Sequence, residues 1–214
     1  MAGIETMARE PRIYIVDDDA AVRDSLQLLL TSAGYDQVVA YPSGLTFLGE
    51  SKPQTGDCLL LDVQMPDIGG LELQNELKRR ATELAVIIMT GHADVPIAVR
   101  AMKAGAADFI EKPFSDMELL GAVGKALAAA AETSREHEQA SETLRRAQTL
   151  TAREREVFEA MISGRPNKVI AHDLGISQRT VEIHRARVMD KMEAPNLSTL
   201  VRWAMAAQIV AKRD

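Results

Sequence analysis

Hydrophobic and polar positions alternate in two different ways along the first 120 or so residues. Short runs of consecutive apolar residues are followed by longer stretches in which apolar residues recur every three or four positions. The first pattern is typical of a strand buried on both faces, and the second of an amphipathic helix. We expect strands at residues 13–16, 38–40, 58–61, 85–89 and 109–111, and helices at residues 20–33, 43–49, 71–80 and 95–104. This order predicts an α/β fold with a five-stranded, doubly wound parallel sheet in the order 2-1-3-4-5.

A single long helix is expected after the last strand. Ser115 and Glu118 form a capping box at its start, and no Gly or Pro occurs between residues 125 and 163. The helix is predicted to run from about Ser115 to about Gln148, roughly 50 Å at 1.5 Å per residue. Residues spaced three and four apart form one stripe along this helix, and the middle of the stripe is polar. Such a stripe fits either a weak dimerising seam or a solvated connector helix. The stripe contains Leu120, Val123, Leu127, Ala130, Ser134, His137, Ser141 and Leu144.

Four short helices are predicted in the last third of the chain. A second capping box, Thr151 with Glu154, begins the first of them, and Gly175 makes a tight turn between the second and the third. This arrangement indicates a small all-α helix-turn-helix domain. The four helices are expected to end near Ser163, Leu174, Met192 and Val210. The predicted organisation is an α/β domain at residues 12–127, a helical linker at 128–148 and the helix-turn-helix domain at 149–214.

Composition and charge support two domains with different partners. The chain has 214 residues, and no apolar stretch approaches the roughly 20 residues that span a bilayer. Of the 25 basic and 31 acidic side chains, 11 and 8 lie in residues 149–214, which leaves 14 and 23 in residues 1–148. The single cysteine, Cys58, excludes an internal disulfide and is expected to be buried and inert. Residues 1–11 lack the features of a secretory signal, so we expect a cytoplasmic protein with no membrane partner.

Four of the predicted strands lead directly into polar or charged residues. Asp17 and Asp18 follow the first strand, Asp62 closes the third, Thr90 closes the fourth, and Lys112 follows the fifth. Ligands bind at the carboxyl edge of an open parallel sheet, so these side chains are expected to converge. Each one alone is typical of a turn, a helix cap or a surface charge. Together, at successive strand ends, they indicate one site.

The chemistry expected at this site is phosphorylation of Asp62. A carboxylate and an incoming phosphoryl group repel each other, and neighbouring acids increase the repulsion. Mg²⁺ (or Mn²⁺) prefers carboxylate and water oxygens and would neutralise the site. Lys112 and Thr90 are expected to bind the phosphoryl oxygens, and Lys112–Pro113 is a candidate cis peptide. The expected metal ligands are Asp18 and Asp62 directly, Asp17 through water, and the backbone carbonyl of Gln64.

Two other classes of protein fit these residues less well. A phosphatase of the haloacid dehalogenase class needs a second aspartate two residues after the nucleophile, where this chain has Gln64. A flavodoxin-like FMN-binding protein needs a phosphate loop rich in Ser, Thr and Gly after the first strand. Three aspartates stand there instead and would repel a phosphate. Neither of these two classes is therefore favoured.

This pattern resembles the receiver domain of two-component response regulators, which has the flavodoxin/CheY-like fold. The resemblance covers residues 12–127 and includes the acid pair, Asp62 in the motif Asp-x-x-Met-Pro-x-x-x-Gly, Thr90 and Lys112-Pro113. It implies phosphotransfer to Asp62 from the phosphohistidine of a sensor histidine kinase. It also implies a switch in which Thr90 moves toward the phosphoryl group and Phe109 rotates inward. By the same resemblance, the chain is not an enzyme, since a receiver only promotes its own phosphotransfer and slow dephosphorylation, and Gln64 and His92 tune that dephosphorylation.

The predicted helix at residues 177–192 is the candidate for DNA recognition. Val181, Val188 and Met192 fall on one face and are expected to pack inward. On charge pattern alone, an ordinary amphipathic surface helix explains this segment. However, its surrounding motifs resemble the LuxR-type helix-turn-helix over nearly all of residues 149–210. These motifs are Leu150-Thr-x-Arg-Glu, Asn167-Lys168-x-Ile170-Ala171, Leu174-Gly-Ile-Ser177, Thr180-Val181-x-x-His184 and Lys191-Met192.

The LuxR-type resemblance implies contacts with double-stranded DNA. Base-facing positions are Glu182, Ile183 and Ala186, where Glu182 can accept from cytosine and Ile183 can touch a thymine methyl. Arg179 is a further expected DNA-contact residue. Residues expected at or near the phosphates are Asn167, Lys168, Thr180, His184, Arg185, Arg187 and Lys191.

Together the two resemblances indicate a response regulator of the FixJ/NarL class, most similar to FixJ-like members. The implied function is phosphorylation-dependent binding of promoter DNA as a homodimer, with transcription activation and RNA polymerase as a further partner. The alternative is a phospho-switched module whose helical domain binds protein instead of DNA.

Overall fold

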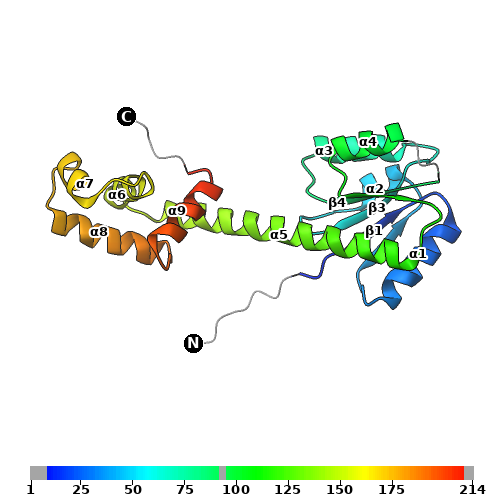
Figure 1. Ribbon diagram of the computed structural model, residues 1–214, viewed down its shortest axis with the longest axis horizontal. Helices are drawn as coiled ribbons and strands as arrows, with labels where there is room; N and C mark the ends of the chain where they lie inside the picture. Colours follow the sequence, from blue (N-terminus) through cyan, green and yellow to red (C-terminus); the bar gives the residue numbers. More distant parts are fainter. Residues whose placement is uncertain (1–8, 92–94, 210–214) are drawn as a thin grey trace. The chain divides into compact units, whose positions relative to one another are not determined.

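The computed structural model describes residues 9–91 and 95–209 and divides into two compact units, residues 1–134 and 135–214 (Figure 1). The first unit is built on a parallel sheet with the strand order β2-β1-β3-β4-β5, which confirms the predicted topology. Its strands are β1 (Ile13–Val16), β2 (Val38–Tyr41), β3 (Cys58–Asp62), β4 (Ala85–Thr90) and β5 (Asp108–Glu111).

The central strands are short apolar runs because helices cover both faces of the sheet. Every residue of β3 is buried, and Leu60 and Leu61 point into different clusters. The cluster with Leu60 packs against α1 and α5, whereas the cluster with Leu61 packs against α2, α3 and α4. These helices are α1 (Ala20–Ser32), α2 (Gly44–Glu50), α3 (Gly70–Arg79), α4 (Val95–Ala104) and α5 (Asp116–Gln148). The two-sided packing leaves the strand ends as the place where polar side chains can gather.

The long helix is present as predicted, with 33 residues in α5. The Ser115 hydroxyl oxygen accepts a hydrogen bond from the backbone N–H of Glu118, as the capping motif requires. The division between the two units falls within this helix, at Ser134 and Arg135. None of the described helices is long and apolar enough to cross a bilayer.

The second unit adds four short helices to the end of α5. A buried core that includes Val157, Phe158, Val181 and Leu200 joins them. The helices are α6 (Ala152–Ile162), α7 (Asn167–Asp173), α8 (Gln178–Lys191) and α9 (Leu197–Ala206). Between α7 and α8, Gly175 has a φ of +65°, a left-handed conformation that glycine adopts without steric cost.

The last helix is shorter than predicted. We expected it to reach Val210, but it ends at Ala206, and Val210 lies outside the described residues. The Gln208 backbone is left-handed, with a φ of +53°, and the N–H of Ile209 donates back to the carbonyl of Ala204. This closing turn satisfies helix-end carbonyls and stops the helix, a local feature that amphipathic spacing does not reveal.

Candidate functional site

Lys112 joins two of the acids that were predicted to converge. Its ammonium nitrogen lies 2.6 Å from Asp17 Oδ2 and 2.6 Å from Asp62 Oδ1. Asp17 is fully buried, Asp62 is 6% exposed, and the lysine side chain is 23% exposed. Two carboxylates from neighbouring strands therefore share one cation at the carboxyl edge of the sheet.

The surrounding backbone holds these three side chains in place. The N–H of Lys112 donates to the carbonyl oxygen of Thr90 at 2.7 Å, and the Lys112–Pro113 peptide bond is cis, as predicted. The other oxygen of Asp62 accepts from the N–H of Gln64 at 2.6 Å. Asp17 Oδ1 accepts from the N–H of Asp19 at 2.9 Å. Every carboxylate oxygen of Asp17 and Asp62 thus has a donor.

A close approach between backbones sets the loop after Asp62. The first residue of α3, Gly70, has an N–H that donates to the carbonyl of Val63 at 3.0 Å. A Cβ at Gly70 would collide with the Asp62 carbonyl oxygen and would lie 3.0 Å from the Asp62 carbonyl carbon. The start of α3 can pack under the acceptor residue only because Gly70 has no side chain.

Burial and the Lys112 ammonium shift the pKa of the acceptor Asp62 in opposite directions. Burial raises the pKa of Asp62 above its usual value, the Lys112 ammonium lowers it in part, and Asp17 raises it again. For Lys112, burial lowers the pKa, but the two carboxylates outweigh that effect and leave the pKa raised. The lysine is therefore held in its charged form between the two acids.

The other predicted residues of this site differ in burial. Thr90 is buried at the end of β4, and Phe109 is half-buried in β5 and packs against the cluster that contains Tyr14. Asp18 and Gln64 are exposed. The remaining predicted residue, His92, lies outside the described residues.

The donor set suits a hard divalent cation, although its arrangement differs from the predicted one. Within residues 9–91 and 95–209, no three Asp, Glu, His or Cys side chains come together as a metal site. Lys112 stands between Asp17 and Asp62, and the Asp18 carboxylate is exposed beside them. The two buried carboxylates, one exposed carboxylate and one lysine still have an excess of negative charge. Such oxygen donors are those that Mg²⁺ prefers.

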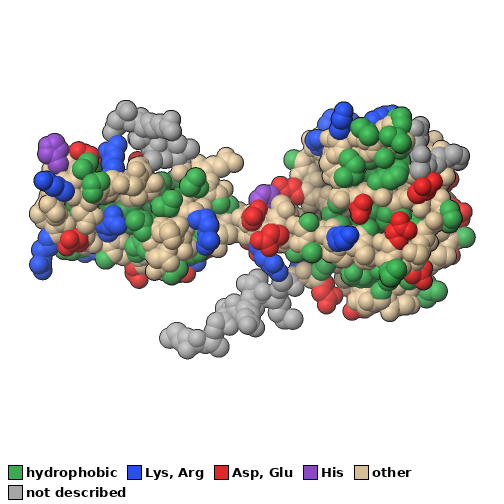
Figure 2. Space-filling view, in the orientation of Figure 1, with side chains coloured by type: hydrophobic (Ala, Val, Ile, Leu, Met, Phe, Trp, Pro, Cys, Tyr) green, Lys and Arg blue, Asp and Glu red, His purple; other side chains and the backbone are tan. Residues whose placement is uncertain are grey.

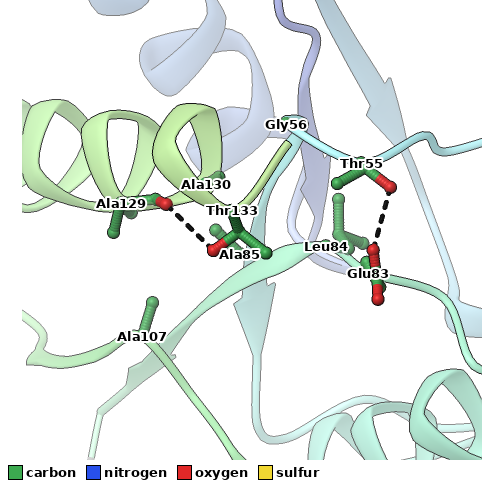
Figure 3. Close-up of a pocket in the computed structure, with 10 residues that line it drawn as sticks. Thr55, Gly56, Glu83, Leu84, Ala85, Ala107, Ala129, Ala130 and Thr133 are labelled. Carbon is green, nitrogen blue, oxygen red and sulfur yellow. Dashed lines mark hydrogen bonds between the residues drawn. The ribbon is translucent and has the colours of Figure 1, made fainter. Parts of the chain in front are cut away.

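A cavity of about 250 Å³ lies at the opposite, amino edge of the sheet (Figure 3). Short loops before β3, β4 and β5 and the small side chains of α5 form its wall. Two hydrogen bonds cross its rim, from Thr55 to Glu83 and from Thr133 to the carbonyl of Ala129. The cavity contains none of the predicted site residues, so its size is no guide to the chemistry. Its lining residues are Thr55, Gly56, Glu83, Leu84, Ala85, Ala107, Ala126, Ala129, Ala130 and Thr133.

In the second unit, α8 separates inward and outward residues as predicted. Val181, Val188 and Met192 are buried, whereas Ile183 keeps 47% of its surface exposed. Figure 2 shows several basic side chains over the part of this unit formed by α7 and α8. The other predicted DNA-contact residues that are exposed are Lys168, Arg179, Glu182, Ala186 and Arg187. Those that are half-buried are Asn167, Thr180, His184, Arg185 and Lys191.

Lys191 has a partner that the sequence pattern did not reveal. Its ammonium lies 2.6 Å from the buried carboxylate of Glu154 and 3.3 Å from the carbonyl oxygen of Thr149. The same carboxylate accepts from the N–H of Thr151, which completes the predicted capping box. The Lys191 ammonium, with the Thr151 N–H, lowers the pKa of Glu154 to about 2. The capping motif located Glu154, but no local signal in the sequence pairs it with a residue 37 positions away.

Each of the two units matches a known protein family. Residues 13–124 match the response regulator receiver domain, and residues 148–204 match the LuxR family of bacterial regulatory proteins. The chain belongs to the two-component response regulators of the FixJ/NarL class, which join a receiver to a LuxR-type DNA-binding domain. A receiver implies a histidine kinase partner, and a LuxR-type domain implies DNA. Receivers of this family typically bind Mg²⁺.

Individual relatives are similar over nearly the whole chain. The transcriptional regulatory protein FixJ of Azorhizobium caulinodans is 48% identical over 202 residues, which cover 94% of this chain and 95% of the relative. The FixJ protein of Bradyrhizobium diazoefficiens is 44% identical, with 94% and 98% covered. Among solved structures, response regulator StyR has a TM-score of 0.78 at 38% identity and covers 92% of this chain and 99% of its own. The names of these relatives describe regulators and not enzymes.

Proposed function

We propose that this chain is a transcription activator controlled by phosphorylation of Asp62, with a sensor histidine kinase as the donor. The observation that supports this proposal most directly is the Lys112 ammonium held 2.6 Å from both Asp17 and Asp62. A buried acid beside a fixed cation at the carboxyl edge of the sheet is suited to accept a phosphoryl group.

In the proposed reaction, a carboxylate oxygen of Asp62 attacks phosphorus. The bond between phosphorus and the donor imidazole nitrogen breaks, and the electron pair remains on that nitrogen. Lys112 neutralises a phosphoryl oxygen, and the Thr90 hydroxyl donates a hydrogen bond to another. Asp18 and Asp62, with Asp17 through water and the Gln64 carbonyl, would hold Mg²⁺. When bound, Mg²⁺ (or Mn²⁺) supplies positive charge that offsets the repulsion between acceptor and phosphoryl group.

Phosphorylation would then change the surface of the first unit. A phosphoryl group adds about −1.5 to −2 charges, and it would draw the Lys112 ammonium away from Asp17. Movement of Thr90 and inward rotation of Phe109 would follow and favour homodimerisation. Phe109 is half-buried, so inward rotation would bury more of its ring. Gln64 and His92 would set the rate of the slow dephosphorylation that ends the signal.

The proposed output is binding of a dimer to promoter DNA, with RNA polymerase as the downstream partner. Exposure on α8 supports the base-facing assignment of Ile183 and Glu182, because an apolar side chain that is 47% exposed has surface to bury in a groove. The outward cations Lys168, Arg179 and Arg187 would contact phosphates. A dimer places two such helices on two half-sites, and this pairing increases specificity.

Labelling with acetyl phosphate and Mg²⁺ tests the phosphorylation step. The wild-type chain should take up the label, and Asp62→Asn should take up none while it remains folded. Asp19→Asn is a matched control, because the Asp19 carboxylate caps α1 by accepting from the N–H of Ala21. It should be labelled like wild type. Equal labelling of Asp62→Asn and wild type would refute the assignment of the acceptor.

Dimerisation and DNA binding need separate measurements. Sedimentation should detect dimers of the labelled wild-type chain but not of Asp62→Asn treated in the same way. In a titration with duplex DNA, Lys168→Ala should weaken binding to all sequences and reduce the salt slope by about 1. Glu182→Ala should instead relax base preference. A chain that dimerises after labelling but shows no salt-dependent DNA binding would favour a protein-interaction module.

A further inference from the structure

Within the second unit, three cations from three helices contact carbonyl oxygens at the ends of neighbouring helices. Arg146, from the last turn of α5, reaches the carbonyl of Met192, which ends α8. Arg155, from α6, reaches the carbonyl of Ala147 in α5 at 3.1 Å. Lys191, from α8, contacts the carbonyl of Thr149, just after α5. We call this arrangement the helix joint, and it is formed by Arg146, Arg155, Lys191 and these three carbonyls.

Helix ends explain why cations gather here. The last carbonyls of a helix have no partner within the helix, and the aligned peptide dipoles place partial negative charge there. Each cation of the helix joint therefore satisfies an oxygen of another helix. These contacts link the ends of α5 and α8 in both directions, and Arg155 links α6 to the same end of α5.

Arg146 is the most heavily used side chain of the helix joint. Its Nη1 donates to the Met192 carbonyl at 3.0 Å, and its Nη2 lies 2.7 Å from the Glu193 carboxylate. Its Nε donates to Glu142 at 2.6 Å, within α5 itself. The side chain is only 20% exposed. A planar guanidinium with all three nitrogens in contact with partners fixes the orientation of those partners as well as their distance. A single ammonium group fixes only the distance.

The neighbouring Arg145 provides a contrast one residue away. Its side chain is 70% exposed, and its contacts are with Glu142 in the same helix. It therefore shares an acid with Arg146, but its hydrogen bonds to Glu142 stay within α5, and it interacts with Glu193, just beyond α8, through charge. Ala147, near the end of α5, and Leu150, just after it, are both buried in the core of the second unit. The end of α5 is thus packed as part of the helix-turn-helix unit.

We propose that Arg146 is a positioning residue for DNA binding, which fixes the C-terminal end of the recognition helix α8 to the last turn of α5. Lys191 has the same role from the other side and is not primarily a phosphate contact. Residues 135–148 are then a functional part of the DNA-binding unit, and a shift of the end of α5 is passed on to α8. This inference rests on the DNA binding proposed above.

A matched pair of arginine variants of the full chain tests the inference. The probe is a duplex that the wild-type chain selects from a random-sequence library, titrated at several salt concentrations. Arg146→Ala should weaken binding about tenfold without changing the salt slope. Arg145→Ala should stay within about twofold of wild type. Arg146→Lys, which keeps the charge but loses the planar fork, should recover only part of the loss.

Three outcomes would overturn the inference. Binding of Arg146→Ala within twofold of wild type would show that α8 is positioned without it, even if its thermal stability falls. A salt slope reduced by about 1 would mean that Arg146 contacts a phosphate itself. If the wild-type chain selects no duplex, the proposed DNA binding fails first and the role of Arg146 falls with it.

Glu193→Gln keeps the test decisive if Arg146→Ala does not fold. Glu193 is 69% exposed at its side chain, so this variant removes one partner of Arg146 with little effect on the core. It should weaken binding about two- to threefold at an unchanged salt slope. Combined with Arg146→Lys, it should add less than its separate effect, because both act on the same contact. The positioning role would be rejected if Glu193→Gln and Arg146→Lys both bind the duplex as tightly as the wild-type chain.

Discussion

Gly70→Ala is the sharpest test of how the acceptor is held. The added Cβ would overlap the Asp62 carbonyl oxygen by more than about 1 Å, taking about 3.5 Å as a normal contact. The atoms it meets are backbone atoms of Asp62 and Val63, which cannot rotate away as a side chain can. Overpacking of this kind typically costs about 1–3 kcal/mol. The rigid neighbours place Gly70→Ala in the upper half of that range, so we expect a loss of about 2–3 kcal/mol.

The chain offers an internal reference for this measurement. All three tyrosines lie in the first unit, and the only tryptophan, Trp203, lies in the second. Urea unfolding followed by tyrosine near-UV circular dichroism therefore reports on the receiver, and tryptophan fluorescence reports on the helix-turn-helix unit. With a slope of about 1–3 kcal/mol per M, the tyrosine transition should move down by about 0.7–3 M urea. The tryptophan transition should not move.

Gly121→Ala is the matched control. Gly121 lies in α5, and a Cβ there would meet no atom within 4 Å. Alanine is a better helix former than glycine by up to about 1 kcal/mol, so this variant should be neutral or slightly more stable. Phosphoryl labelling of Asp62 should be slowed by Gly70→Ala and unchanged by Gly121→Ala. A loss below about 0.5 kcal/mol for Gly70→Ala, or equal losses for both variants, would refute the close-approach argument.

Three further predictions concern titration and reactivity. Because burial raises the folded pKa of Asp62 above its unfolded value, its contribution to stability is present below the unfolded pKa and is lost as the pH rises through the folded pKa. Asp62→Asn should therefore be more stable than wild type at pH 7 but not at pH 3, by urea unfolding of the tyrosine signal. Glu154 has a pKa lowered to about 2, so its contribution is present above pH 4.5 and is lost as the pH falls toward 2. Glu154→Gln should lower the tryptophan transition at pH 7 and match wild type near pH 2; an equal shift at both values would contradict the ion pair. Cys58 is buried with a pKa raised to about 12, so a thiol reagent should modify it only in urea, and rapid modification of the native chain would disprove its burial.

Local pattern was enough to predict the elements of both units. The apolar runs that became β1 and β3, and the helical spacing that became α1, are properties of consecutive residues. The strand order then follows from the limited ways in which strand–helix units can pack. The same reasoning placed Asp62 and Lys112 at one edge of the sheet, because parallel strands end on the same side. The end of α9 was missed because the backbone turn at Gln208 has no periodic signal.

Partners of charged side chains were harder to predict than their locations. No pattern in the sequence marks Asp57, yet its buried carboxylate pairs with Arg9 and accepts from the N–H groups of Arg12 and Gln54. Lys191 is predicted to contact a phosphate, and the structure adds an ion pair with Glu154 that the sequence did not reveal. The acids at the first strand end are predicted to hold a metal ion, and the structure adds a contact of Lys112 with both Asp17 and Asp62. Each of these pairings depends on which long side chains lie close to an acid in the folded chain.

The amino-acid sequence by itself determined the two kinds of unit, the long helix between them and the acids at the strand ends, because these depend on neighbouring residues. The tertiary structure alone decided that Lys112 bridges two strands, that Gly70 must lack a side chain, and that Arg146 reaches the end of α8. Lys112 meets an acid 95 positions away, and Arg146 a carbonyl 46 positions away. Such contacts form only after packing fixes the distances, to within tenths of an ångström, between groups that the chain itself leaves far apart.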